Sequence, residues 1–165
     1  MGPRPTIRHA GLIARRLGGF WRGVLIEGPS GAGKSDLALR ALSQGWDLVA
    51  DDRTLVFLSG GRVFGRAPAP LRGRLEIRGL GILPTACLDV AEIGLIVRLV
   101  PPATVARLPK PGSDQLLGVA ICVLELSPLE SSATAKLNRA IEHLGARRQG
   151  GYDASFAPPP GHDGT

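Results

Sequence analysis

One eight-residue segment constrains the fold of this chain more than any other. Residues 28–35 read Gly-Pro-Ser-Gly-Ala-Gly-Lys-Ser and match the phosphate-binding pattern GxxxxGK[ST] at every fixed position. A short apolar run at 23–27 precedes the segment, and apolar residues recur at helical spacing after it until Gly45. This order of strand, glycine-rich loop and helix indicates an α/β domain that binds phosphate groups.

The loop predicts which residues contact a nucleotide, because its backbone N–H groups and the start of the following helix attract phosphate. The predicted nucleotide-binding residues are Gly28, Pro29, Ser30, Gly31, Ala32, Gly33, Lys34 and Ser35. We expect Lys34, in an exposed loop, to reach the β- and γ-phosphates and the Ser35 hydroxyl to coordinate Mg²⁺. The alternative is a tight turn that contains lysine and serine by coincidence, which the flanking strand and helix disfavour.

A pair of carboxylates follows the next apolar run. Asp51 and Asp52 come after Leu48-Val-Ala50 and lie 17 and 18 residues beyond Lys34. On its own such a pair is usually a solvated turn, but phosphoryl transfer needs a metal-binding acid and a base. Adjacent residues of a strand point to opposite faces, so we expect the two aspartates to divide these roles. The sequence leaves open which residue has which role.

The remaining pattern favours one domain with a mostly β core. A chain of 165 residues is long enough for one core and short for two, and only 4% of the residues are aromatic. A hairpin is predicted around Ser59-Gly60-Gly61, and a helix from about 133 to 144 with Ser131 or Ser132 as its N-cap. Strands are predicted at 7–14, 23–27, 48–50, 55–58, 62–64, 75–77, 93–100 and 116–126.

The composition of the chain indicates which class of binding partner and which cellular compartment to expect. The formal charge of +6 comes largely from scattered arginines for which we expect no aromatic stacking partners, and this favours an acidic protein or phosphate partner over nucleic acid. Cys87 and Cys122 are far apart and belong to no metal-binding pattern, so we expect reduced thiols. The longest apolar stretch, 116–124, is too short to span a bilayer, and no signal peptide is recognisable. We predict a cytoplasmic protein.

A third motif carries a family resemblance. Residues 75–82 read Leu-Glu-Ile-Arg-Gly-Leu-Gly-Ile and place Glu76 and Arg78 on one face of an extended segment, where a surface ion pair is the simplest interpretation. Together with residues 28–35 and Leu-Val-Ala-Asp-Asp at 48–52, this stretch resembles the catalytic domain of bacterial HPr kinase/phosphorylase. The resemblance extends from His9-Ala-Gly to Gly-Tyr-Asp-Ala at 151–154. That family phosphorylates a seryl hydroxyl of HPr, a small phosphocarrier protein of the sugar phosphotransferase system, and can reverse the reaction with inorganic phosphate.

The resemblance implies a set of site residues. ATP and Mg²⁺ would be the cofactors, with Ser35 and Glu76 holding the metal. Asp51 and Asp52 would supply the base and its partner. Arg78 or Arg107 would offset charge that develops during transfer. The implied catalytic residues are His9, Lys34, Asp51, Asp52, Arg78 and Arg107.

Some features depart from the family pattern. Full-length relatives carry an N-terminal domain of about the same size as this chain, which we do not expect to find in this protein. Residues 126–140 also lack the family segment Val-Pro-Val-Lys…Gly-Arg-Asn, which is tied to the phosphorylase direction. We therefore expect the kinase direction to dominate. Family analogy also suggests a homohexamer.

The prediction from the sequence is a single α/β P-loop kinase domain over residues 1–156, followed by a disordered tail at 157–165. Its predicted function is Mg-ATP-dependent phosphorylation of a serine on an HPr-like phosphocarrier protein. Two alternatives remain. One is a P-loop kinase of a small-molecule hydroxyl, and the other is a nucleotide-sensing module without catalysis.

Overall fold

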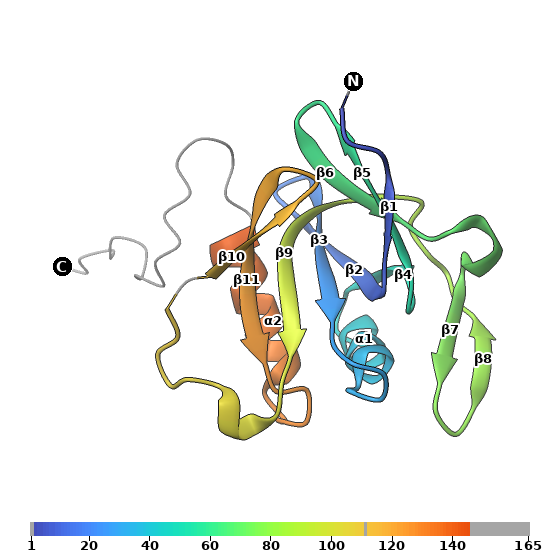
Figure 1. Ribbon diagram of the computed structural model, residues 1–165. Helices are drawn as coiled ribbons and strands as arrows, with labels where there is room; N and C mark the ends of the chain where they lie inside the picture. The colour runs from blue at the N-terminus through green and yellow to red at the C-terminus, as the bar shows by residue number, and fades with distance from the viewer. Residues whose placement is uncertain (1, 111, 146–165) are drawn as a thin grey trace.

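A mixed β-sheet forms the centre of the molecule, and the structure, a computed structural model, describes residues 2–110 and 112–145 (Figure 1). The strands of this sheet are β1 (Thr6–Arg8), β2 (Ala10–Leu17), β3 (Phe20–Glu27), β4 (Asp47–Ala50), β5 (Thr54–Ser59), β6 (Arg62–Arg66), β9 (Ala91–Leu99), β10 (Gly112–Leu116) and β11 (Val119–Leu126). Their order is β1-β5-β6-β9-β3-β2-β4, and the β10–β11 hairpin joins through β11 to β9. A separate two-stranded sheet contains β7 (Arg74–Ile77) and β8 (Gly81–Pro84).

Strand β9 organises the sheet because it pairs along both of its edges. It runs parallel to β3 on one edge, with Glu27 opposite Arg98. On its other edge it pairs with β6 near its start and, in parallel, with β11 near its end. The parallel strands β3, β9 and β11 therefore end on the same side of the sheet, where the glycine-rich loop begins. Such an edge is the usual place for a ligand in an α/β sheet.

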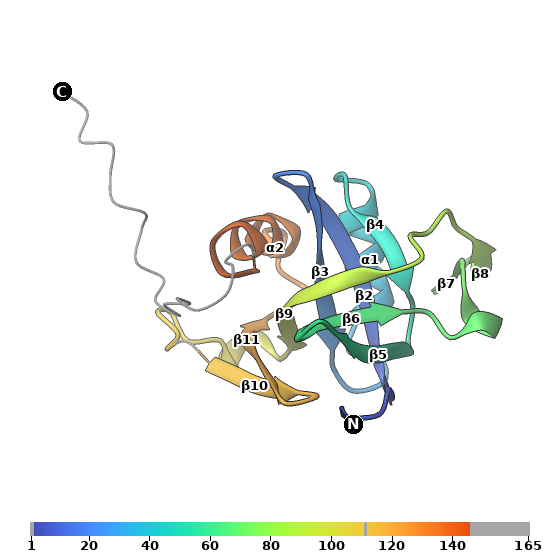
Figure 2. The same ribbon diagram turned by 90° about the horizontal axis from the view of Figure 1, so that it is seen from above.

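Two helices and a few short turns complete the fold. The helical segments are α1 (Lys34–Leu42), α2 (Ala133–Ala140), a π-helical turn at Ile141–Gly145, and 3₁₀ turns at Ala69–Leu71 and Pro102–Thr104. In the view from above, α1 and α2 lie in the upper part of the molecule, whereas β5, β6 and β10 lie in the lower part (Figure 2). Ser132 is the N-cap of α2, but its side chain makes no capping hydrogen bond.

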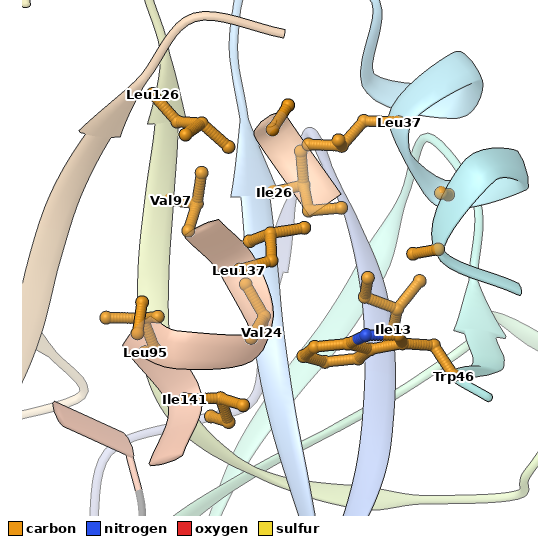
Figure 3. Close-up of a cluster of buried hydrophobic side chains, with 14 of the residues drawn as sticks. Ile13, Val24, Ile26, Leu37, Trp46, Leu95, Val97, Leu126, Leu137 and Ile141 are labelled. Carbon is orange, nitrogen blue, oxygen red and sulfur yellow. The ribbon is translucent and has the colours of Figure 1, made fainter. Parts of the chain in front are cut away.

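Burial follows this layering, with a core cluster on each face of the sheet. The larger cluster lies between the sheet and the helices, where Leu37 of α1 and Leu137 of α2 pack toward Ile26 and Val97 (Figure 3). The indole of Trp46 closes this cluster, and its Nε1 donates a 2.7 Å hydrogen bond to Oδ1 of Asn138. The second cluster comprises Ala10, Leu12, Ala14, Leu25, Val49, Ala50, Val56, Val63, Ala91, Ile93, Ile96, Leu116 and Ile121.

Two predicted strands are each divided in the structure. The segment 7–14 forms β1 and β2, because the chain bends at His9 and the two strands pair with different partners. The prediction of a single strand over 116–126 is wrong. The segment turns at Leu117 and Gly118, whose φ angles of 51° and 81° suit a tight hairpin. Because Leu117 is apolar, the turn does not interrupt the apolar pattern of the sequence, and hydropathy alone does not indicate it.

Other expectations have mixed outcomes. Neither Cys87 nor Cys122 forms a disulfide within the described residues. Within the described part of the chain, no helix is long and apolar enough to cross a membrane. Arg78 lies in the turn of the β7–β8 hairpin, because β7 ends at Ile77. The prediction that Glu76 and Arg78 share one face of an extended segment is therefore wrong. The motif at 151–154 and the tail at 157–165 lie outside the described residues.

Candidate active site

The glycine-rich loop connects β3 to α1 at the edge where the parallel strands end. Gly33 is the N-cap of α1, with φ 102° and ψ 23°. This left-handed conformation favours glycine, and no side chain caps the helix start. At Gly28 a Cβ atom would lie 3.1 Å from Cβ of Ala32 and 3.2 Å from Cβ of Leu99. The loop is therefore tightly folded, with the first amide groups of α1 free of capping side chains.

Lys34 is more enclosed than its position in a loop predicts. Its Nζ donates hydrogen bonds to the carbonyl oxygens of Gly28 at 2.7 Å and Pro29 at 3.1 Å. The residue is only 8% exposed. The loop itself lies at the surface, with Pro29, Ser30 and Gly31 exposed, but it wraps around the lysine side chain. Its ammonium group thus links the start of α1 to the first two residues of the loop and stabilises the loop conformation.

Ser35 and Asp51 meet at the start of α1. The Ser35 hydroxyl donates a 2.8 Å hydrogen bond to Oδ1 of Asp51. The other carboxylate oxygen, Oδ2, accepts a 3.0 Å hydrogen bond from the backbone amide of Glu76 on β7. Both oxygens of Asp51 are thus occupied, and the carboxylate joins the loop, the end of β4 and the β7–β8 hairpin.

Asp52 points to a different partner. Its Oδ1 lies 2.7 Å from Nε2 of His9, at the junction of β1 and β2. Asp52 has φ 65°, a left-handed conformation that aspartate tolerates better than most residues. The side chains of His9 and Asp52 are 55% and 51% exposed, so both can be reached from solvent. The two aspartates therefore have different partners, but the predicted alternation along a strand is not the cause, because β4 ends at Ala50 and both residues lie in the bend that follows it.

An ion-pair network that the sequence analysis did not identify supports this region. Glu27, which directly precedes the loop, pairs with Arg8 on β1 and with Nε of Arg98 on β9 at 3.3 Å. Arg98 also pairs with Asp114 on β10. The network links four strands close to His9 and Gly28. The signal in the sequence was a charged residue at the end of a buried strand, which gives no indication of its partners.

Three of the predicted site residues, Glu76, Arg78 and Arg107, make few contacts or none with the other described residues of the site. The Glu76 side chain is exposed, and only its backbone amide bonds to Asp51. Arg78 and Arg107 are exposed, and neither contributes a hydrogen bond or ion pair to the site within residues 2–110 and 112–145. The surface ion pair considered for Glu76 and Arg78 is not formed between these described side chains. Their roles, like those of the other site residues, stay predictions.

The side chains at the loop fit a magnesium–phosphate group. The Ser35 hydroxyl and the Asp51 carboxylate provide neighbouring hard oxygens beside an uncapped helix start. Magnesium is usually held by one or two carboxylates, with phosphate oxygens and water completing its shell. In the part of the chain that the structure describes, no cluster of three or more His, Cys, Asp or Glu side chains could hold a metal. A metal shared with bound phosphate suits this donor set.

Comparison with known proteins identifies relatives along most of the chain. Residues 16–125 match the family described as HPr Serine kinase C-terminal domain. The HPr kinase/phosphorylase of Burkholderia cenocepacia is 41% identical over 119 residues, which are 66% of this chain and 35% of that protein. The HPr kinase/phosphorylase of Leptothrix cholodnii is 40% identical over 112 residues, 60% of this chain and 34% of that protein. The chain thus spans about a third of the length of these relatives.

The fold is also found among solved structures. The structure of the Hpr(Ser) kinase/phosphatase from Coxiella burnetii matches with a TM-score of 0.68 and 24% sequence identity, covering 83% of this chain and 92% of that chain. This likeness confirms the predicted α/β fold class. The family match spans more than half of the chain and includes residues 28–35, both aspartates and Glu76. This chain therefore belongs to the HPr serine kinase C-terminal domain family.

Proposed function

We propose that this protein is an Mg-ATP-dependent serine kinase that phosphorylates a seryl hydroxyl of an HPr-like phosphocarrier protein. Family membership supports the reaction class. The single observation that carries the proposal is the paired arrangement of the aspartates, with Asp51 bonded to Ser35 at 2.8 Å and Asp52 beside His9 at 2.7 Å. Phosphoryl transfer to a hydroxyl needs these two functions side by side, a metal-binding group at the phosphates and a base at the acceptor.

The loop and α1 bind and orient the nucleotide in this proposal. The amides of the glycine-rich loop and the uncapped start of α1 bind the phosphate oxygens. Lys34 exchanges its bonds to Gly28 and Pro29 for contacts with the phosphates. Ser35, Asp51 and Glu76 would hold Mg²⁺, which, when bound, neutralises phosphate charge and helps align the γ-phosphoryl group.

Asp52 is the proposed base. It is half exposed, and its carboxylate is not committed to the loop, so it can approach a hydroxyl presented from solvent. The seryl oxygen forms a bond to the γ-phosphorus while the bond from that phosphorus to the bridging oxygen of ADP breaks, and the seryl proton passes to Asp52. His9 holds the Asp52 carboxylate in position from the other side. Arg78 or Arg107 would approach the transferring group only once substrates are bound.

Further properties belong to the same proposal. The protein acts in the cytoplasm and assembles as a homohexamer, as family analogy suggests. The reverse phosphorylase reaction uses the same site but is weaker than the kinase reaction, because the segment tied to that direction is absent from 126–140. A small-molecule acceptor and a nucleotide sensor without turnover are the competing functions.

One experiment separates these functions. The purified chain is incubated with γ-labelled ATP, Mg²⁺ and HPr, and phosphate transfer is followed on the protein. Label on a serine of HPr supports the proposal. Label on a metabolite from a small-molecule extract, with none on HPr, supports the small-molecule kinase, and nucleotide binding without transfer supports the sensor. Phosphate-dependent loss of label from phospho-HPr measures the reverse reaction.

A further inference from the structure

The β7–β8 hairpin carries apolar side chains that the rest of the described chain leaves uncovered. Leu80 in its turn is 70% exposed, Ile82 on β8 is 63% exposed and Leu83 is 39% exposed. Every residue of β8 is exposed, and the hairpin forms its own sheet beside the main one. Leu75 on β7 is in contrast 1% exposed and anchors the hairpin in the core next to α1. Strand β7 is thus packed against the core through Leu75, whereas β8 is exposed to solvent.

The open face of the hairpin is continuous with the candidate active site. Cross-strand partners in an antiparallel pair project from the same face. Glu76 pairs with Ile82 and Arg74 pairs with Pro84, so these four residues share the face opposite the buried Leu75. The amide of Glu76 bonds to Asp51. Ile82 is therefore the immediate cross-strand neighbour of the residue that connects the hairpin to the site.

The orientation of the hairpin supports the same connection. It stands beside α1, and its turn lies at the end of the molecule where the glycine-rich loop is found (Figure 1). A macromolecule that covers Leu80 and Ile82 would therefore lie at the same end of the molecule as the glycine-rich loop. A nucleotide in the loop does not need this surface.

The charges beside the apolar residues indicate the chemistry of the partner. Arg74 and Arg78 are exposed and, among the described residues, pair with no carboxylate. The neighbouring Arg72 is in contrast already paired with Asp89. Two uncompensated guanidinium groups next to an apolar strip suit a surface that combines apolar side chains with carboxylates.

We propose that the β7–β8 hairpin is the docking surface for the acceptor protein, which contacts Leu80 and Ile82 through apolar side chains and Arg74 and Arg78 through carboxylates. This inference rests on the proposed kinase function and adds the surface that selects a protein acceptor over a small hydroxyl compound. A second copy of the chain is a less suitable occupant. A stable interface between two copies would take roughly 20–30 residues a side, whereas a transient encounter with a substrate protein can be smaller, and the hairpin at 74–84 is short.

The test measures binding and turnover separately. HPr binding is titrated calorimetrically, and kcat and the KM for HPr and for ATP are measured for the wild type, Ile82→Ser, Leu80→Ser and the conservative Ile82→Val. Phe20→Ser is the matched control. Phe20 is also an apolar residue on a strand and is 46% exposed, but it lies at the start of β3, beside the turn that joins β2 to β3. Circular dichroism and the oligomeric state are recorded for each variant.

We expect Ile82→Ser and Leu80→Ser to raise the Kd and KM for HPr about tenfold each, as the loss of one buried apolar contact predicts. The KM for ATP, the oligomeric state and the Phe20→Ser variant should remain close to the wild type, and Ile82→Val should restore most of the affinity. Arg74→Gln should weaken HPr binding chiefly at low ionic strength, and Arg78 is left unchanged in this test because it is also a proposed catalytic residue.

The outcomes distinguish this inference from the proposed function. If HPr binds in a hairpin-dependent way but is not phosphorylated, the docking surface stands and the kinase proposal fails. If HPr is phosphorylated with the same KM by the hairpin variants, the docking surface is overturned and the kinase proposal stands. Undetectable HPr binding to the wild type, or a change of oligomeric state in Ile82→Ser in place of a change in HPr affinity, also overturns the docking surface.

Discussion

Nε2 of His9 lies 2.7 Å from Oδ1 of Asp52, although the two residues are 43 positions apart in the sequence. The contact joins the bend between β1 and β2 to the end of β4. It leaves Asp51 free to bond with Ser35 and the Glu76 amide on the other side. These partners favour our proposal that Asp52 is the base and Asp51 the residue linked to the metal. The sequence alone does not distinguish the two roles, because the two aspartates are adjacent.

Asp52→Asn should reduce kcat for phosphoryl transfer by about 10²–10⁴-fold, because an amide cannot accept the seryl proton. Nucleotide affinity should be nearly unchanged, since Asp52 does not contact the loop in this structure. His9→Gln should cause a smaller loss. Single-turnover transfer to HPr and equilibrium nucleotide binding measure these effects, with Asp47→Asn at the opposite end of β4 as the control. Wild-type kcat in Asp52→Asn would exclude it as the base.

Asp51→Asn should raise the Mg²⁺ concentration needed for half-maximal rate, and excess Mg²⁺ should restore part of the activity. The physical reason is the loss of a charged oxygen ligand beside Ser35. The same titration applied to Asp52→Asn should show no such rescue. Identical Mg²⁺ dependence in the two variants would contradict the division of roles.

Glu76→Gln tests whether the exposed Glu76 side chain reaches the metal. We expect a lower rate and a higher Mg²⁺ requirement, and a loss in the double variant with Ser35→Ala that is smaller than the sum of the single losses in free energy. Glu125→Gln is a matched control, because Glu125 is an exposed carboxylate on β11. If the Mg²⁺ curve of Glu76→Gln coincides with that of the wild type, Glu76 is not a ligand.

Lys34→Ala should reduce transfer by on the order of 10²-fold or more, because the ammonium no longer offsets phosphate charge. It should also loosen the loop, since the bonds to Gly28 and Pro29 are lost. Limited proteolysis should cleave the loop faster while the circular dichroism stays native. Lys136→Ala, on exposed α2 surface, should change neither measurement. Unaltered transfer in Lys34→Ala would mean that the loop motif has another purpose.

Gly23→Ala should destabilise the fold by about 1–3 kcal/mol. A Cβ atom at Gly23 would lie 2.8 Å from the backbone oxygen of Glu92 and 3.0 Å from Cδ1 of Leu12, at a point where neither strand can move freely. Gly11→Ala is the control, because its nearest atom would be the Ala50 oxygen at an ordinary 3.5 Å. Urea unfolding measures both, and equal stability of the two variants would contradict the predicted clash.

Local pattern determined much of this molecule. The strand, loop and helix around residues 23–42 follow from apolar spacing and glycines that act within a few residues, and the structure has them where the sequence predicts them. The hairpin at β5–β6 and the helix near 133–140 follow for the same reason. The phosphate-binding pattern and the Asp-Asp pair are also contiguous motifs that depend on residue type and local backbone, and the chemistry that they predict stays a prediction.

Only the tertiary structure decided which distant groups meet. The contacts of Asp52 with His9 and of Asp51 with Glu76 cross from one strand end to another. The enclosed position of Lys34 also depends on how the loop folds back over it. So does the separation of β10 from β11, where an apolar leucine adopts a turn conformation. These features depend on strand order and register, which arise from packing the two apolar faces of one sheet and leave no periodic trace along the chain.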